Sequence, residues 1–191
     1  MAQFAYTLRR WKRLEYERLV ELGAFEGDPL ELISGQLIVA EPKGTYHTSA
    51  VTSCEYALRA VLPPGWLVRT QAPISLDEDS APEPDIVVVA GRLGDFRYAH
   101  PARPPLVIEV ADSSLAFDRH DKGSLYARAG LQDYWIINLV DRLLEIYRDP
   151  VADPGALYGW RYRSLVSLGA TDVVRPLALP SVQLAVVDLL P

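Results

Sequence analysis

The sequence predicts an α/β (α+β) protein in which buried strands and helices share one domain over residues 1–191. Two apolar runs, 86–89 and 106–110, are nearly all Val, Ile and Leu, which is typical of strands covered on both faces. Segments of helical period lie at 7–22 and 46–61, before these runs, and at 117–129, after them. With 49% hydrophobic residues, a chain of 191 residues can bury a substantial core.

Composition limits the classes of function. The net charge of −6 and the sequence pI of about 5.1 argue against a broad electrostatic grip on nucleic acid, although a local basic strip remains open. The single cysteine, Cys54, excludes an intramolecular disulfide framework and is expected to be a small buried hydrophobe in a reducing compartment. No apolar run is long enough for a membrane span and no signal-peptide core is present, so we expect no membrane partner and a cytoplasmic protein.

The first helix is expected over residues 7–22, where apolar residues recur at helical spacing before Gly23 and the turn at 27–29. It carries the densest basic cluster of the chain, formed by Arg9, Arg10, Lys12 and Arg13. This cluster has two interpretations, a solvated helix face and a phosphate-facing patch, of which the first is the more common.

A hairpin is expected next, with strands 30–33 and 36–40 around Ser34-Gly35. Glu31 is an acid inside an apolar strand, and taken alone it indicates an edge-strand charge. The second helix, 46–61, places His47 at the start of an apolar face, where a hydrogen-bonded structural histidine is favoured over a ligand or base. Short strands at 66–69 and 72–76 and an acidic turn at 77–82 follow.

Two acids mark the ends of the central apolar strands. Asp85 stands at the start of the first strand and Glu109 near the end of the second. The connection at 90–105 contains Gly, Pro and Arg and no helical pattern, which favours an antiparallel return over a helical crossover. In that geometry the start of one strand lies beside the end of the other, so Asp85 and Glu109 are predicted to be neighbours.

The third helix is expected over 117–129, with Gly130 as its C-cap. Asp118 and Lys122 stand at i and i+4, which alone would be a routine surface pair. The remaining chain predicts a hairpin of 134–139 and 143–148. Further short strands are expected at 158–165, 171–174 and 182–187.

Neighbouring buried carboxylates either share a proton or hold a cation. Hard oxygen ligands suit Mg²⁺ or Mn²⁺, and a nearby lysine could orient an attacking water and stabilise a phosphoryl transition state. Zinc patterns, a Gly-rich phosphate loop and a Gly-x-Ser-x-Gly context are missing from the sequence. A structural alternative is that both acids pair with arginines such as Arg92 or Arg103.

Several motifs stand in a fixed order along the chain. They are Glu31-Leu32-Ile33-x-Gly35, His47, Pro84-Asp85, Glu109-Val110, Asp118-x-x-x-Lys122-x-x-x-Tyr126-Ala127-x-x-Gly130 and Tyr134-Trp135. This ordered set, over nearly the whole chain, resembles the Uma-type putative restriction endonuclease family of the PD-(D/E)XK nuclease superfamily.

The resemblance implies a restriction-endonuclease-like fold, with a mixed central β-sheet flanked by helices. It implies a divalent metal, Mg²⁺ or Mn²⁺, held by Asp85, Glu109 and the backbone carbonyl of Val110, with Glu31 as a further ligand directly or through water. The superfamily's usual lysine falls two residues after the second acid, where this chain has Ala111. The resemblance assigns that role to Lys122 on the following helix.

The expected function is therefore a metal-dependent endonuclease that hydrolyses phosphodiester bonds of DNA through metal-activated water. Its catalytic residues would be Asp85, Glu109, Lys122 and Glu31. Paired cuts on duplex DNA would require a homodimer. The alternative is a catalytically weak or inactive module of the same fold that binds nucleic acid or protein, which Ala111 and the acidic pI favour.

Overall fold

A six-stranded mixed sheet forms the centre of the protein, in a computed structural model that describes residues 7–40 and 42–191. The strand order is β3-β4-β5-β6-β7-β8, and all neighbours are antiparallel except the parallel pair β5–β6. The strands are β3 (Trp66–Thr70), β4 (Ile86–Ala90), β5 (Leu106–Ala111), β6 (Asp133–Asn138), β7 (Leu143–Ala152) and β8 (Trp160–Leu168). The expected class, a mixed central sheet flanked by helices, is confirmed.

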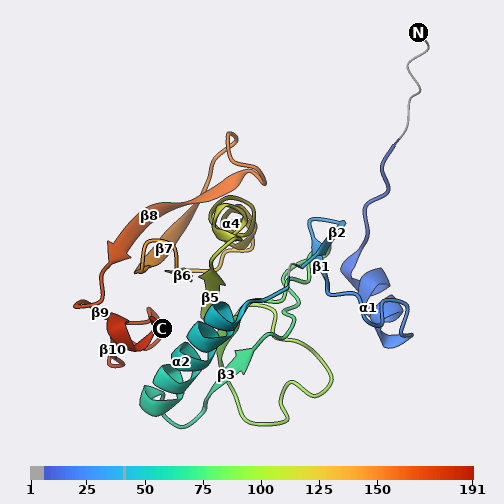
Figure 1. Ribbon diagram of the computed structural model, residues 1–191. Coiled ribbons are helices and arrows are strands. Elements are labelled where there is room, and N and C mark those ends of the chain that lie inside the picture. The colour runs from blue at the N-terminus through green and yellow to red at the C-terminus, as the bar shows by residue number, and fades with distance from the viewer. Residues whose placement is uncertain (1–6, 41) are drawn as a thin grey trace.

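Helices cover both faces of the sheet, and α2 and α4 lie on opposite sides of β5 (Figure 1). The first face packs against α2 (Thr45–Val61). The second packs against the connection from β5 to β6, because parallel strands need a crossover. That connection consists of α3 (Leu115–Phe117), the π-helical turn η1 (Asp118–Lys122) and α4 (Gly123–Arg128).

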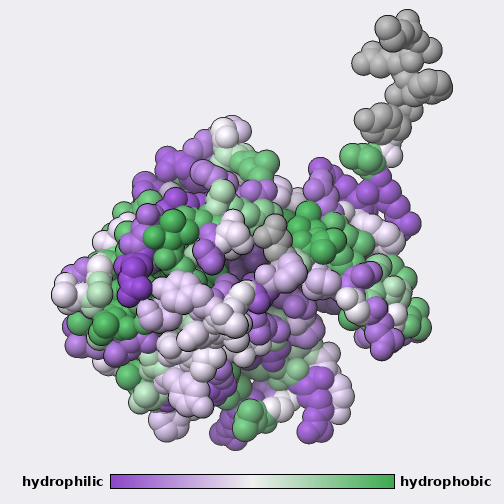
Figure 2. Space-filling model, in the orientation of Figure 1, coloured by the Kyte–Doolittle hydropathy of each residue, from purple (hydrophilic) through white to green (hydrophobic). Residues whose placement is uncertain are grey.

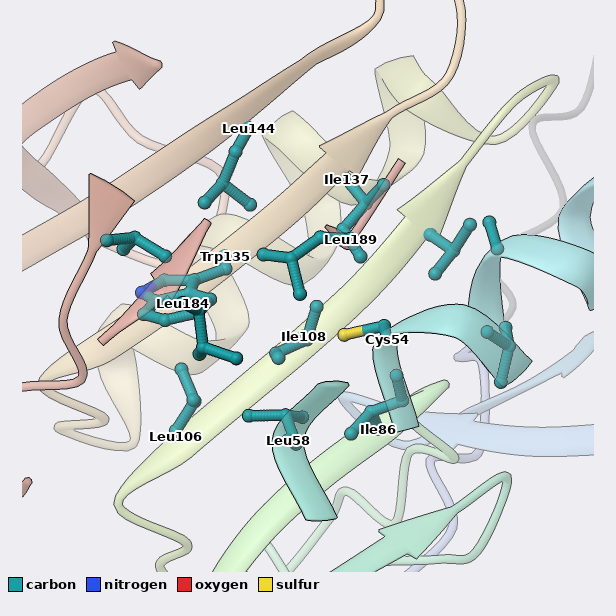
Figure 3. Packing of buried hydrophobic residues seen from close by; sticks show 14 of the residues in the cluster. Cys54, Leu58, Ile86, Leu106, Ile108, Trp135, Ile137, Leu144, Leu184 and Leu189 are labelled. Carbon is teal, nitrogen blue, oxygen red and sulfur yellow. The ribbon is translucent and has the colours of Figure 1, made fainter. Parts of the chain in front are cut away.

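Successive side chains of β4 and β5 point to opposite faces of the sheet, so each strand contributes to two separate apolar clusters. Figure 3 shows Cys54 and Leu58 of α2 pointing toward Ile86 and Ile108 of the sheet. On the other face, residues such as Val107 pack with the side chains of α4. Cys54 is fully buried, as predicted for a small hydrophobe. Because both faces of β4 and β5 are covered, a charged side chain at their ends needs a partner.

The predicted hairpin is confirmed as β1 (Leu30–Ile33) paired with β2 (Gln36–Val39). Its two turn residues have positive φ angles, 46° at Ser34 and 79° at Gly35, as in a type I′ turn. A Cβ added at Gly35 would lie 2.7 Å from the Cβ of Arg10, so glycine also permits a close approach of the N-terminal segment.

The first helix is shorter than predicted. It begins at Arg13 rather than at residue 7, and α1 spans Arg13–Glu21. Before it, the backbone N–H of Trp11 donates to the carbonyl of Gly35 at 2.9 Å. The segment 7–12 is thus tied to the hairpin by tertiary contacts, which override its helical pattern.

The basic cluster of this segment is engaged by the chain's own acceptors. Arg9 contacts Glu15 at 2.6 Å, Arg10 donates to the Ser34 carbonyl at 2.5 Å, Lys12 lies 3.6 Å from Glu78, and Arg13 contacts Glu17 at 2.7 Å. These contacts favour a structural role over a phosphate-facing patch.

The third predicted helix is present, but a π turn interrupts its α-helical hydrogen bonding. Between α3 and α4 the backbone forms the π turn η1, in which the N–H of Gly123 donates to the carbonyl of Asp118, five residues earlier. The same carbonyl accepts a hydrogen bond from the Tyr134 hydroxyl at 2.9 Å. A π turn holds an additional residue, and such turns occur frequently at functional sites.

Other elements agree with the sequence to different degrees. The hairpin β6–β7 is confirmed, whereas the strand predicted at 72–76 is wrong: Leu76 N–H bonds the Ser80 carbonyl in a local turn. The C-terminal region forms the small pair β9 (Val173–Val174) and β10 (Leu184–Ala185) and the 3₁₀ turn η2 (Val186–Asp188), on the α2 side of the sheet.

The visible surface carries hydrophobic residues in separate patches among hydrophilic ones (Figure 2). Among the helices of the described ranges, none combines the length and apolar character needed to cross a membrane.

Candidate active site

The antiparallel pairing of β4 and β5 brings the two predicted acids together. Ile86 is in register with Ile108, so Asp85 and Glu109 meet just beyond the paired positions. The backbone N–H of Asp85 donates to Glu109 Oε2 at 3.3 Å, and the N–H of Val110 donates to Asp85 Oδ2 at 2.9 Å. The predicted adjacency is confirmed.

Asp85 is 2% exposed and is surrounded by donors from the start of α2. Lys43 Nζ lies 3.0 Å from Oδ1, and His47 Nε2 lies 3.1 Å from Oδ2. Burial opposes ionisation of Asp85, but the hydrogen bond to His47 and the charge of Lys43 outweigh it and lower the pKa of Asp85 to about 2. Asp85 is therefore a carboxylate at neutral pH.

Glu109 is 1% exposed and is held from the opposite side. Its Oε1 accepts hydrogen bonds from Lys122 Nζ at 3.0 Å and from the Tyr126 hydroxyl at 2.7 Å. Burial raises the pKa of Glu109 to about 8, against the charge of Lys122 and with the added repulsion of Asp118. In the metal-free protein Glu109 therefore keeps its proton through most of the neutral range, whereas Asp85 beside it is ionised.

Lys122 reaches Glu109 from the π turn. Ala111 lies on the same face of β5 as Glu109, where it is buried in the apolar cluster with Leu125 of α4. An ammonium at position 111 would have to lie within that cluster. In this protein the cation comes instead from Lys122, in the π turn between α3 and α4.

Glu31 also enters the site. Its Oε2 lies 3.4 Å from Lys122 Nζ and accepts the backbone N–H of Glu83 at 3.1 Å. The hairpin therefore presents Glu31 to the buried lysine, and the interpretation as a simple edge-strand charge is wrong.

Asp118 and Lys122 are both buried, so the interpretation as a surface i,i+4 pair is also wrong. Asp118 Oδ2 accepts the Ser114 hydroxyl at 2.5 Å, while the ammonium of Lys122 is directed to Glu109 and Glu31. Burial raises the pKa of Asp118, against the charge of Lys122 and the hydrogen bond from Ser114. Asp118 adds a further carboxylate beside the site.

A pocket of about 330 Å³ opens over these groups. One part of its wall is charged and the other, from β2 and the adjoining segment, is apolar. Its lining includes Glu31, Ile38, Val39, Lys43, Gly44, His47, Glu109, Ser114, Phe117, Asp118 and Lys122. The pocket gives a small polar ligand access to Glu109 and to both lysines.

The sequence did not predict three contacts of the two acids. Lys43 received no role, although it directly precedes the predicted second helix and is one of only three lysines in the chain. His47 is hydrogen-bonded, as predicted, but its partner is the candidate catalytic acid Asp85. Tyr126 lay within the quoted motif and its hydroxyl binds Glu109.

The alternative that arginines neutralise the acids is not supported. The cations that contact Asp85 and Glu109 are Lys43 and Lys122, and neither Arg92 nor Arg103 makes a hydrogen bond or ion pair with them in the described part of the chain.

The donor set fits a hard divalent cation in its chemistry. Asp85 and Glu109 offer adjacent carboxyl groups in a buried position, and Mg²⁺ commonly binds through one or two carboxylates and retains waters. Among the residues that the structure describes, no group of three His, Cys, Asp or Glu side chains is arranged to hold a metal. Lys43 and Lys122 each place an ammonium group 3.0 Å from one of these two carboxyl groups.

Comparison with known proteins assigns the chain to a family. A solved structure described as a putative nuclease belonging to DUF820, from Anabaena variabilis ATCC 29413, has a TM-score of 0.61 and 18% sequence identity over 84% of this chain and 88% of that chain, which supports the fold. No curated protein matches the chain. The family model described as Uma2, putative restriction endonuclease, matches residues 14–187. Because that match spans most of the chain, the protein belongs to the Uma2 family of putative restriction endonucleases.

Proposed function

We propose that the protein is a metal-dependent endonuclease of the PD-(D/E)XK type that hydrolyses phosphodiester bonds of DNA. The observation that carries this proposal is the buried pair Asp85–Glu109, in which Glu109 lines a pocket together with Lys122. Membership of a family described as putative restriction endonucleases supports the same reaction class.

Asp85, Glu109 and the backbone carbonyl of Val110 are the proposed ligands of one Mg²⁺ or Mn²⁺ ion, with Glu31 as a further ligand directly or through water. When bound, the ion supplies positive charge beside the scissile phosphate. The carboxylate of Asp85 is ready for this role because its pKa is lowered to about 2. Glu109, whose pKa is raised to about 8, would release its proton to bind the cation.

Lys122 positions the attacking water and stabilises charge. Burial alone would lower the pKa of Lys122, but the charges of Glu109 and Glu31 raise it above its ordinary value. The ammonium therefore remains protonated at neutral pH and does not accept the proton of the water. Its fixed positive charge instead favours the negative charge that develops on the phosphoryl oxygens during in-line attack.

Plasmid cleavage in Mg²⁺ or Mn²⁺ tests this proposal. We expect Asp85→Asn, Glu109→Gln and Lys122→Met each to reduce the rate by at least about 100-fold, since each removes a group that acts on the transition state. Glu55→Gln, on α2 outside the pocket lining, is the matched carboxylate control. Cleavage that survives all three site changes would refute the assignment of these residues.

A second candidate function is a catalytically weak or inactive module that binds nucleic acid or protein. Ala111 at the usual lysine position and the self-paired carboxylates favour it. Calorimetry separates the two: the enzyme requires binding of Mg²⁺ or Mn²⁺ in the millimolar range or tighter, and this binding should be lost in Asp85→Asn. Absence of metal binding by the wild type would favour the module.

We further propose that the protein acts on duplex DNA as a homodimer, which provides two sites for paired cuts. The edge strand β8 spans nine residues and exposes Leu165 and Val166, a combination that invites pairing with another strand. Sedimentation equilibrium should give twice the chain mass, and Val166→Lys should shift it toward the monomer. A monomer at all concentrations would contradict this part.

A further inference from the structure

Lys43 differs from the other cation of the pocket because part of its side chain is free. Its side chain is 42% exposed, whereas that of Asp85, 3.0 Å away, is only 3% exposed. Lys122 is 6% exposed and lies between Glu109 and Glu31. A lysine on a flexible four-carbon stem can exchange one anionic partner for another, so Lys43 is the cation able to move toward a ligand.

The start of α2 provides donors next to Lys43. The N-cap residue is Gly44, which supplies no side-chain cap, and the first turn contains no acidic residue. The first N–H groups of a helix lack intrahelical partners and, with the helix dipole, favour an anion. Lys43, Gly44 and His47 line the same pocket as Glu109 and Lys122, so this helix end opens into the candidate active site.

An independent observation concerns His47. The residue is 6% exposed and lines this pocket, and its Nδ1 atom is buried without a hydrogen-bond partner in the structure as described. Its Nε2 atom faces Asp85 and Lys43. A buried polar atom without a partner costs free energy, so the described groups of the chain satisfy this pocket-lining imidazole only in part.

We propose that Lys43, together with the N-terminus of α2 and His47, forms the subsite that anchors a nucleotide phosphate of the substrate. This inference rests on the proposed nuclease function and names the residues that hold its substrate. On binding, the ammonium of Lys43 exchanges the carboxylate of Asp85 for a phosphate oxygen, while the N–H groups at the start of α2 bind the same anion. The phosphate then lies between the Asp85–Glu109 pair and the helix.

The test is calorimetric titration of the full chain with a 5′-phosphorylated thymidine dinucleotide, in buffer containing Ca²⁺. Lys43→Ala should weaken dinucleotide binding by at least about tenfold, because a charge-assisted hydrogen bond is lost. Lys43→Arg should retain most of the affinity. Lys12→Ala removes an exposed lysine that pairs with Glu78 outside the pocket, and it should leave the affinity unchanged.

A second titration, with Mn²⁺ alone, distinguishes two roles of Lys43: an anchor for the phosphate and a structural partner of Asp85. Lys43→Ala should bind Mn²⁺ at least as tightly as the wild type, because Asp85 loses a competing cation. If dinucleotide and Mn²⁺ affinities fall by the same factor, or if dinucleotide binding is unchanged, the inference is wrong.

Amide NMR of the unmodified protein gives a readout that needs no variant. The N–H signals of Gly44 and Thr45 should shift on titration with the dinucleotide, and unmoved signals would overturn the inference. Failure of the nuclease proposal looks different. Dinucleotide binding that depends on Lys43, without DNA cleavage by the wild type, would refute only the nuclease, whereas cleavage with an unchanged KM in Lys43→Ala would refute only the anchor.

Discussion

At the scale of single residues, the site consists of two neighbouring carboxylates whose pKa values move in opposite directions. Asp85 is buried but receives bonds from His47 and Lys43, which lower its pKa to about 2. Burial disfavours the charged form of Glu109 more strongly than the ammonium of Lys122 favours it, so the pKa of Glu109 rises to about 8. Environments that separate two like groups in this way are typical of sites that handle protons or cations.

Glu109 should make the stability of the metal-free protein depend on pH. Its folded pKa of about 8 lies above the ordinary value of 4.5, so the folded state keeps a proton that the unfolded chain releases. Its stabilising contribution is complete below pH 4.5 and is lost as the pH rises toward 8, with a slope of at most about 1.4 kcal/mol per pH unit. Glu109→Gln cannot titrate, so its free energy of unfolding should decline less over this range.

Urea unfolding in EDTA, followed between pH 5 and pH 8 by circular dichroism, measures this difference. Glu55→Gln serves as the control, because Glu55 lies outside the pocket lining. Equal pH slopes for the wild type and Glu109→Gln would show that Glu109 is ionised throughout.

Lys122 and Glu109 should be energetically coupled. Lys122→Met leaves Glu109 buried without its ammonium partner, and we expect it to lower the free energy of unfolding by about 3 kcal/mol at pH 8. At pH 5 the loss should be smaller, because Glu109 is then protonated in both proteins and needs no ammonium partner. In the double variant Lys122→Met/Glu109→Gln both partners are neutral, so most of the stability should return. A double variant as unstable as the single one would contradict the coupling.

The residue pair was predictable, but its full surroundings were not. Strand direction alone placed Asp85 beside Glu109, because two dense apolar runs and a connection without helical period admit one simple pairing. Lys43 has no such pattern: its contact with Asp85 depends on how α2 packs on the sheet, 42 positions away in the chain. A single lysine in a loop carries no periodic signal from which that packing can be inferred.

At the scale of elements, the periodicity of the sequence did not predict the backbone conformation where tertiary contacts determine it. The segment 7–12 has helical spacing, yet Trp11 bonds the hairpin and α1 starts only at Arg13. The π turn Asp118–Lys122 is likewise invisible in the sequence, because its residues fit an α-helix equally well. The expected helix was therefore correct in extent, but the turn that carries Lys122 was not predicted.

Removing one residue from the π turn should separate fold from function. Deletion of the exposed His120 should convert η1 into ordinary α-helix, and helix content by circular dichroism should be retained. The deletion changes the phase between Asp118 and Lys122, so DNA cleavage should fall by at least about 100-fold, as expected for a catalytic group displaced by an ångström or more. Deletion of Leu93, in the exposed β4–β5 connection, is the matched control. Unchanged cleavage by the His120 deletion would show that the π turn has no part in the site.

At the scale of the whole molecule, charge is unfavourable for a general grip on DNA. The chain has 19 Lys and Arg against 25 Asp and Glu, and the basic cluster near the N-terminus is paired internally. Family membership follows from the match over residues 14–187, and the mixed sheet agrees with it. The proposed binding of DNA is therefore expected to depend on local cations at the pocket rather than on the surface as a whole.

This distribution of charge predicts that the affinity for DNA depends only weakly on salt concentration. Each phosphate neutralised by a basic side chain contributes a slope of about −0.9 to log K against log salt, so a complex that relies on Lys43 and few other side chains should show a slope no steeper than about −3. Fluorescence anisotropy with a labelled duplex in Ca²⁺, between low and moderate salt, measures the slope. Removal of Ca²⁺ with EDTA should abolish binding, because the acids of the pocket then repel phosphate. The double variant Arg9→Ala/Lys12→Ala should leave the slope unchanged, since both side chains are paired within the chain. The wild type could instead show a markedly steeper slope that becomes shallower in this double variant. That result would show that the N-terminal basic cluster faces the DNA and that the charge of the pocket alone does not set the affinity.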